Sequence, residues 1–286
     1  MKCKNTVLQL VYLAITLSSW NAASAQVWTL NKGEYYLNAS LSSLQYDEAF
    51  DDAGDIVALP VTVDNKTYQL FAQYGVSPKL TAQVKIPFVQ LSSTGDLTAY
   101  NSYINQYLET GSLSGIGNAE AGVIYKIVDD KPLVSASLFV ETPSDIYNNL
   151  TGLRTGFNSW ALRPGFGVGW GFDQAWLQYY LGTSLRNNDY SHAVLSSLEL
   201  GYKPVSYLYA AMVFETRQSF QNGEDCDCTN SETALFLNNQ EFISFGLKAG
   251  FTLGRVGMNF AYSGAFYGSE VAAAGVPTVG IQFRSN

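Results

Sequence analysis

The chain has 286 residues and a formal net charge of −8, which argues against nucleic acid or an anionic surface as its main partner. Only 14% of the residues are charged, against about 25% in soluble domains, and 14% are aromatic. No segment beyond the N-terminus approaches the length of a membrane-spanning helix. Few charges and many aromatic rings favour a wall that faces lipid.

The first 25 residues have the pattern of a secretory signal peptide. Lys2 and Lys4 form a basic start, an apolar run from Val7 to Leu17 follows, and Ala23-Ser24-Ala25 is a small-residue cleavage site. The apolar run is shorter than the roughly 20 residues that a bilayer-spanning helix needs, which argues against an uncleaved anchor. We therefore predict cleavage after Ala25 and one exported domain at 26–286, which is more acidic still because two lysines leave with the signal.

Alternation of apolar and polar residues is the strongest signal in the exported part of the chain. The clearest alternating stretches are 68–76, 80–88, 118–127, 160–171, 256–263 and 279–284. The first four stretches are nine residues or longer, which exceeds typical soluble strands and suits strands that cross a membrane at a tilt. The polar face of 160–171 also carries four glycines, so that face needs space beside the backbone. The whole pattern predicts about 12 strands.

The connections between these strands alternate between short turns and longer loops. Short turns are predicted at 77–79, 129–131, 172–174, 203–205 and 253–255. Longer loops are predicted at 47–66, 92–115, 144–157, 220–239 and 268–275, with a short exception at 187–189. This alternation predicts an all-β fold, a transmembrane antiparallel up-and-down β-barrel in the outer membrane. A soluble β-sandwich with one solvent-exposed face shows the same alternation of apolar and polar residues and is the less favoured alternative.

Six ionisable residues lie on the polar faces of the predicted strands, which a barrel turns toward its lumen. Counted from the short turns, all six lie at about the same height in the outer half of the wall. They are Glu120, Glu141, Arg163, Arg186, Glu215 and Arg217. Charges there are tolerated only where water or a partner reaches them. Around the wall, the strands with acids are neighbours, and so are the strands with bases. This order predicts either a constriction that selects solutes or a salt-bridge ladder that packs a narrow lumen.

Two acidic loops raise the question of metal binding. The predicted loop at 47–66 contains Asp47, Glu48, Asp51, Asp52 and Asp55. Clustered carboxylates could bind calcium or share divalent ions with lipopolysaccharide, but without regular ligand spacing a solvated loop is favoured. Cys226 and Cys228 lack the four ligands of a zinc site, so free thiols or a strained local disulfide are favoured. We therefore predict no metal and no cofactor.

His192 is the only histidine and thus the only candidate imidazole base. It shares an outward face with Ser196, a pair that a membrane lipid hydrolase would need. No Asp or Asn that could orient the ring lies on that face, and the His-x-Ser-Asn-Gly arrangement of outer-membrane phospholipases is missing. We therefore expect no enzymatic activity, and a lipid hydrolase is the weakest alternative.

The stretch Gly111–Lys126, with the sequence GSLSGIGNAEAGVIYK, resembles a strand entry in outer-membrane transporters grouped under the phenol-degradation "MetA pathway" name. Asn118 stands where that family pattern has Asp. The resemblance implies a 12-stranded barrel that passes small, often hydrophobic or aromatic molecules. Its expected partners are outer-membrane lipid, lipopolysaccharide and a small solute, and the oligomeric state is open. The alternative is a non-conducting barrel that binds a surface partner or stabilises the membrane.

Overall fold

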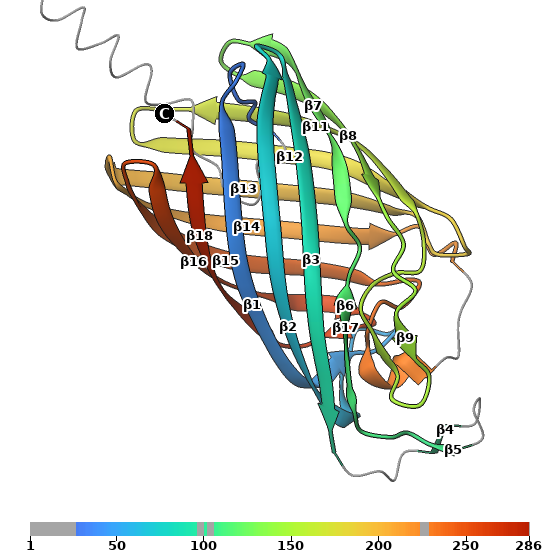
Figure 1. Ribbon diagram of the computed structural model, residues 1–286. Helices are drawn as coiled ribbons and strands as arrows, with labels where there is room; N and C mark the ends of the chain where they lie inside the picture. Colours follow the sequence, from blue (N-terminus) through green and yellow to red (C-terminus); the bar gives the residue numbers. More distant parts are fainter. Residues whose placement is uncertain (1–26, 96–99, 102–105, 224–228, 286) are drawn as a thin grey trace, which may run out of the picture.

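The computed structural model describes residues 27–95, 100–101, 106–223 and 229–285, and these form a closed antiparallel barrel (Figure 1). Within these residues the wall has twelve long strands. They are β1 (Tyr35–Phe50), β2 (Ile56–Ser77), β3 (Leu80–Thr94), β7 (Glu120–Asp129), β8 (Leu133–Glu141), β11 (Ala161–Gly171), β12 (Ala175–Arg186), β13 (Ala193–Val205), β14 (Leu208–Ser219), β15 (Glu241–Leu253), β16 (Val256–Ser269) and β18 (Gly275–Arg284). Each pairs with the next, and β18 pairs with β1 to close the sheet. The predicted barrel of about 12 antiparallel strands is confirmed.

The remaining elements belong to the longer connections. They are β6 (Ser112–Ile116), which pairs with β3, β17 (Val271–Ala272), which pairs with β1, the hairpins β4–β5 (Tyr100–Asn101, Gln106–Tyr107) and β9–β10 (Tyr147–Asn148, Leu153–Arg154), and the 3-10 helix η1 (Thr229–Thr233). In Figure 1, β4, β5 and β9 lie at the lower right, away from the β2–β3 turn at the top. We call these two ends the long-loop end and the short-turn end. The predicted signal peptide at 1–25 lies outside the described residues.

Four of the five predicted short turns are confirmed, namely those at 77–79, 129–131, 172–174 and 253–255. The turn predicted at 203–205 is wrong, because β13 continues to Val205 and the turn is at Ser206 and Tyr207. The pairing register of β13 and β14 shifts between Tyr202 and Val205, which indicates a bulge. With this bulge, β13 continues past Pro204, where the sequence predicts that the strand ends.

The predicted loop at 47–66 is also wrong, because β1 continues to Phe50 and β2 begins at Ile56. These two residues pair directly across the hairpin. The Asp51 carboxylate accepts hydrogen bonds from the backbone N–H groups of Ala53 and Asp55, at 3.0 and 2.9 Å, and so stabilises a tight turn. The predicted loops at 92–115 and 268–275 are shortened in the same way by β6 and β17.

The outer face of the wall is apolar. Leu70, Phe166 and Leu247 are 62%, 61% and 53% exposed, whereas Gln73 on the opposite face of β2 is buried. Exposed aromatic residues lie near both ends of the wall, including Tyr202 and Tyr207 at the short-turn end and Trp160 and Phe266 at the long-loop end. This pattern suits a barrel surrounded by lipid, with aromatic side chains at the two interfaces. None of the helices among the described residues is long and apolar enough to cross a membrane.

Because this face contacts lipid, the destabilisation caused by a charged residue should depend on how deep that residue lies in the membrane. Leu247 lies in the middle of β15, and Leu253 lies on the same strand at the turn. We expect Leu247→Arg to lower the free energy of unfolding by about 2–4 kcal/mol, because an arginine there loses its hydration, and Leu253→Arg by at most about 1 kcal/mol. Denaturant unfolding in lipid vesicles measures both. Equal losses for the two variants would contradict the assignment of this face to lipid.

Candidate functional site in the barrel lumen

Four of the six predicted lumen residues belong to one ion-pair network. Glu120, Glu141, Arg163 and Arg186 come from the neighbouring strands β7, β8, β11 and β12. The guanidinium of Arg163 contacts Glu120 and lies 3.4 Å from Glu141. Nη2 of Arg186 lies 2.6 Å from Glu141, and Nη1 donates a hydrogen bond to Ser159. The structure therefore brings the two acids and the two bases into direct contact.

Lys85 is a fifth member of this network, and the sequence reasoning missed it. Its Nζ lies 3.7 Å from Glu120, which is its direct partner across β3 and β7. The signal was present in the sequence, because Lys85 lies on the polar face of the alternating stretch 80–88. Only the pairing register of the two strands shows that it reaches Glu120.

The cations of the network offset the repulsion between two buried carboxylates that face each other. Glu120 and Glu141 are direct partners across β7 and β8, and their side chains are only 2% and 8% exposed. Two carboxylates placed opposite each other repel, and buried carboxylates are stable only when they are paired. Lys85, Arg163 and Arg186 supply the opposite charge. The network therefore depends on all of its members together.

The other two predicted lumen residues, Glu215 and Arg217, make no ion pair with any described residue. Both share a face of β14 with Val213, which is buried, so both point inward. Nε of Arg217 donates to the backbone carbonyl of Gln240 at 3.2 Å. Glu215 is exposed although it faces the interior. Water therefore reaches the interior at this level.

An apolar cluster fills part of the lumen at the long-loop end. It consists of Tyr46, Val61, Val63, Val89, Leu91, Leu153 and Leu235. The first five come from β1, β2 and β3, whereas Leu153 and Leu235 come from loops that fold inward. The Tyr46 hydroxyl donates to the carbonyl of Thr233 at 2.7 Å, and the Thr233 hydroxyl donates to the carbonyl of Gly152 at 2.8 Å. We call this group the outer cap.

The N-terminal segment 27–34 enters the lumen at the short-turn end. The backbone N–H of Leu30 donates to the hydroxyl of Thr81, and the backbone N–H of Gly33 donates to the carbonyl of Gly75, both at 2.8 Å. Val27 is completely buried. The segment therefore narrows this end of the barrel, and we call it the inner segment.

The inner segment occupies the space that the glycine face of β11 provides. A Cβ atom at Gly167 would lie 2.6 Å from a methyl group of Val27, and one at Gly169 would lie 2.9 Å from the indole of Trp28. Contacts this short are forbidden, so larger residues at these two positions would displace the segment. The glycines thus make room for a chain segment that lies far away in the sequence.

A second buried ion pair lies inside the barrel and was also missed. Nζ of Lys248 on β15 lies 3.0 Å from Glu199 on β13, whose side chain is 4% exposed. The indole N–H of Trp176 donates to the same carboxylate at 2.8 Å. Glu199 and Lys248 lie on the polar faces of their strands, but a strand separates them, so only the closed sheet shows that they meet.

His192 and the nearby serines take part in structural contacts. Nδ1 of His192 accepts a hydrogen bond from the backbone N–H of Arg186 at 3.1 Å. Ser196 shares a hydrogen bond with Thr216 at 2.9 Å. Among the described residues, no hydrogen bond joins the imidazole to a serine hydroxyl, so the pair considered for a hydrolase is not assembled.

The described residues contain no group of three or more His, Cys, Asp or Glu side chains that could hold a metal. Of the five acids in the predicted loop at 47–66, Asp51 binds backbone N–H groups of its own turn. Cys226 and Cys228 lie outside the described residues.

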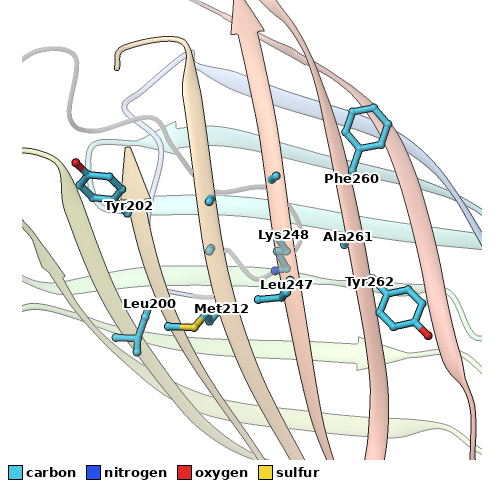
Figure 2. Close-up of a pocket in the computed structure, with 11 residues that line it drawn as sticks. Leu200, Tyr202, Met212, Leu247, Lys248, Phe260, Ala261 and Tyr262 are labelled. Atoms are coloured by element: carbon cyan, nitrogen blue, oxygen red, sulfur yellow. The ribbon is translucent and has the colours of Figure 1, made fainter. Parts of the chain in front are cut away.

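A large pocket of about 600 Å³ lies on the lipid-facing side of the wall and is lined by residues of β13 to β16 (Figure 2). Its floor is a row of small side chains, where Ala210 of β14 pairs with Ala249 of β15. Tyr202 pairs with Ala210 on one side, and Phe260 pairs with Ala249 on the other. The pocket is therefore a shallow apolar depression between two aromatic rings, and it carries none of the lumen charges except Lys248 at its edge.

The ion-pair network predicts a large effect of a single neutral substitution. We expect Glu141→Gln to lower the free energy of unfolding by about 3 kcal/mol, because it leaves Arg186 buried without its carboxylate partner. The matched control is Asp173→Asn, which also removes one carboxylate charge but lies at an exposed position in a short turn. That change should cost less than about 1 kcal/mol. Denaturant unfolding measures both, and similar losses would show that the network is not buried.

One solved structure supports the fold, and two others are similar with lower TM-scores. An outer membrane channel from Pseudomonas putida F1 has a TM-score of 0.69 and 14% identity, covering 93% of this chain and 100% of that chain. The translocator domain of the autotransporter NalP from Neisseria meningitidis has a TM-score of 0.49 and 12% identity, covering 98% and 95% of the two chains. The CymD monoaromatic hydrocarbon channel has a TM-score of 0.48 and 10% identity, covering 100% and 94%. The first likeness confirms the fold of an outer-membrane barrel.

No curated protein matches the sequence significantly. A family model described as "Putative MetA-pathway of phenol degradation" matches residues 56–208, which is more than half of the chain. The matched range includes Gly111–Lys126, so the resemblance predicted from that stretch is confirmed, and the chain belongs to the family of the MetA pathway of phenol degradation.

Proposed function

We propose that this protein is a passive outer-membrane channel for small solutes with hydrophobic or aromatic bodies, and that it catalyses no reaction. Three findings support the proposal: the family of the chain, the barrel fold that it shares with a Pseudomonas putida outer membrane channel, and the apolar outer wall. The barrel holds a water-accessible charged layer between the apolar outer cap and the inner segment, which suits solutes that combine an apolar body with a polar group.

The observation that carries this proposal is the exposure of Glu215 inside the barrel. A lumen packed shut at that level would bury a carboxylate that faces inward, and a buried unpaired carboxylate is unstable. The ion-pair network lies on β3, β7, β8, β11 and β12, and Glu215 lies on β14. We therefore propose that the network lines one side of a water-accessible gap, and that the six predicted residues form its constriction.

The outer cap and the inner segment favour a second candidate, a non-conducting structural barrel. The outer cap fills part of the long-loop end and the inner segment narrows the short-turn end. If both are permanent, no solute passes. Solute-dependent swelling of liposomes and single-channel currents in planar bilayers distinguish the two candidates, since only a channel supports either.

The inner segment provides a direct test. We expect Trp28→Ala to raise the single-channel conductance, because it removes a large ring from the narrow short-turn end. Trp160→Ala is the matched control, since Trp160 is 51% exposed at the long-loop end and its indole lies outside the lumen contacts described above. A conductance that stays at zero in the native protein and in Trp28→Ala would favour the structural barrel.

The charged layer provides a second test. We expect Glu141→Gln to lower the ratio of cation to anion permeability, because it removes one negative charge from the lumen. The double variant Glu141→Gln with Arg186→Gln removes two opposite charges, so its ratio should stay closer to that of the native protein, and it should destabilise the barrel less than Glu141→Gln alone. The reversal potential in a salt gradient measures the permeability ratio. An unchanged reversal potential in Glu141→Gln would place these residues outside the conduction path.

A further inference from the structure

Two arginines lie against one phenylalanine at the charged layer. The guanidinium carbons of Arg186 and Arg217 lie 4.0 and 5.3 Å from the ring centre of Phe157. Tyr190 and Phe236 pack edge-on against the same ring, with centroid distances of 5.5 and 5.1 Å. We call these five residues the arginine–phenylalanine cluster. Two cations at one ring repel each other, and the ring offsets only part of this repulsion.

The acids around the cluster do not neutralise it. Glu141 is already paired with Arg163 and Arg186, and Glu120 with Arg163 and Lys85. Two carboxylates thus serve three cations before Arg217 is counted. Glu215 lies two positions before Arg217 on the same face, and the described residues show no ion pair between them. Even with Glu215 included, the four cations Lys85, Arg163, Arg186 and Arg217 outnumber the three acids Glu120, Glu141 and Glu215 by one.

Some hydrogen-bond donors of the cluster also have no acceptor among the described residues. The Arg186 side chain is 3% exposed, and its Nε is buried with no hydrogen-bond partner among the described residues. Nε of Arg217 uses the carbonyl of Gln240, and no described residue accepts from its two terminal nitrogens. Buried donors in folded proteins are normally paired. The excess charge and the spare donors both call for an acceptor that carries a negative charge.

We propose that the arginine–phenylalanine cluster binds the carboxylate of a small organic acid with an apolar body. A planar carboxylate matches the two-pronged geometry of a guanidinium, which the terminal nitrogens of Arg217 offer. The aromatic side chains Phe157, Tyr190 and Phe236 supply apolar contacts for the body of the acid. This inference rests on the proposed function, because the acid must reach the lumen. It adds that the solute carries a negative charge.

Calorimetric titration of the full protein in detergent tests the proposal. Benzoate should bind, whereas benzamide, which has the same shape and no charge, should bind at least about tenfold more weakly. Arg217→Gln should weaken benzoate binding by at least about tenfold, and Arg255→Gln, the same change at an exposed turn position, should leave it unchanged. Glu215→Gln should strengthen binding, because it removes the nearest unpaired negative charge. Inorganic phosphate should compete only weakly, since it lacks an apolar body.

Equal affinity for benzoate and benzamide, or unchanged benzoate binding in Arg217→Gln, would overturn the proposal. Far-UV circular dichroism confirms that each variant is folded. If Arg217→Gln does not fold, Arg217→Lys replaces it, because it keeps the charge and loses the two-pronged donor, and it should weaken benzoate binding while leaving the fold intact. Binding in detergent needs no transport, so benzoate binding without conductance refutes the channel alone, and conductance without benzoate binding refutes the acid site alone.

Discussion

The closing contact between β1 and β18 is the constraint on which the rest of this structure depends. The pairing runs from Tyr36 opposite Arg284 to Ser42 opposite Thr278, and it leaves no free edge in the wall. Inside a bilayer no water can satisfy an unpaired backbone group, so a sheet must close on itself to cross it. Closure then divides every strand into a lipid-facing side and an enclosed side. The apolar exterior and the polar interior both follow from that division.

The enclosed side is filled in layers that come from different parts of the chain. The inner segment lies against the glycines of β11 at the short-turn end. The ion-pair network and the arginine–phenylalanine cluster form the charged layer, and the outer cap combines strand residues with inward-folded loops. A barrel of twelve strands is too wide for its own side chains to fill as they do with eight strands. Segments outside the wall therefore take part in shaping the lumen.

Only some of the cations in the charged layer are paired with a carboxylate. The paired and the unpaired cations have different roles. Glu120 and Glu141 can lie opposite each other because three cations surround them, so this part of the layer is structural. Arg217 lies just beyond the network, against an aromatic ring, with terminal nitrogens that no described residue uses. A charge that the fold itself does not need is available to a ligand. The proposed acid site and the structural network therefore sit side by side and share Arg186.

The sequence by itself determined the class of fold, the number of strands and the inward face of Glu120, Glu141, Arg163 and Arg186, because a period of two assigns each side chain to one face from local information alone. It did not determine strand ends such as Phe50 and Ile56, which continue past the predicted boundary because the two strands pair with each other. Nor did it join Lys85 to Glu120, Lys248 to Glu199 or Trp28 to Gly169. Those contacts depend on the register between strands and on how distant segments pack into the lumen, and only the tertiary structure decides both.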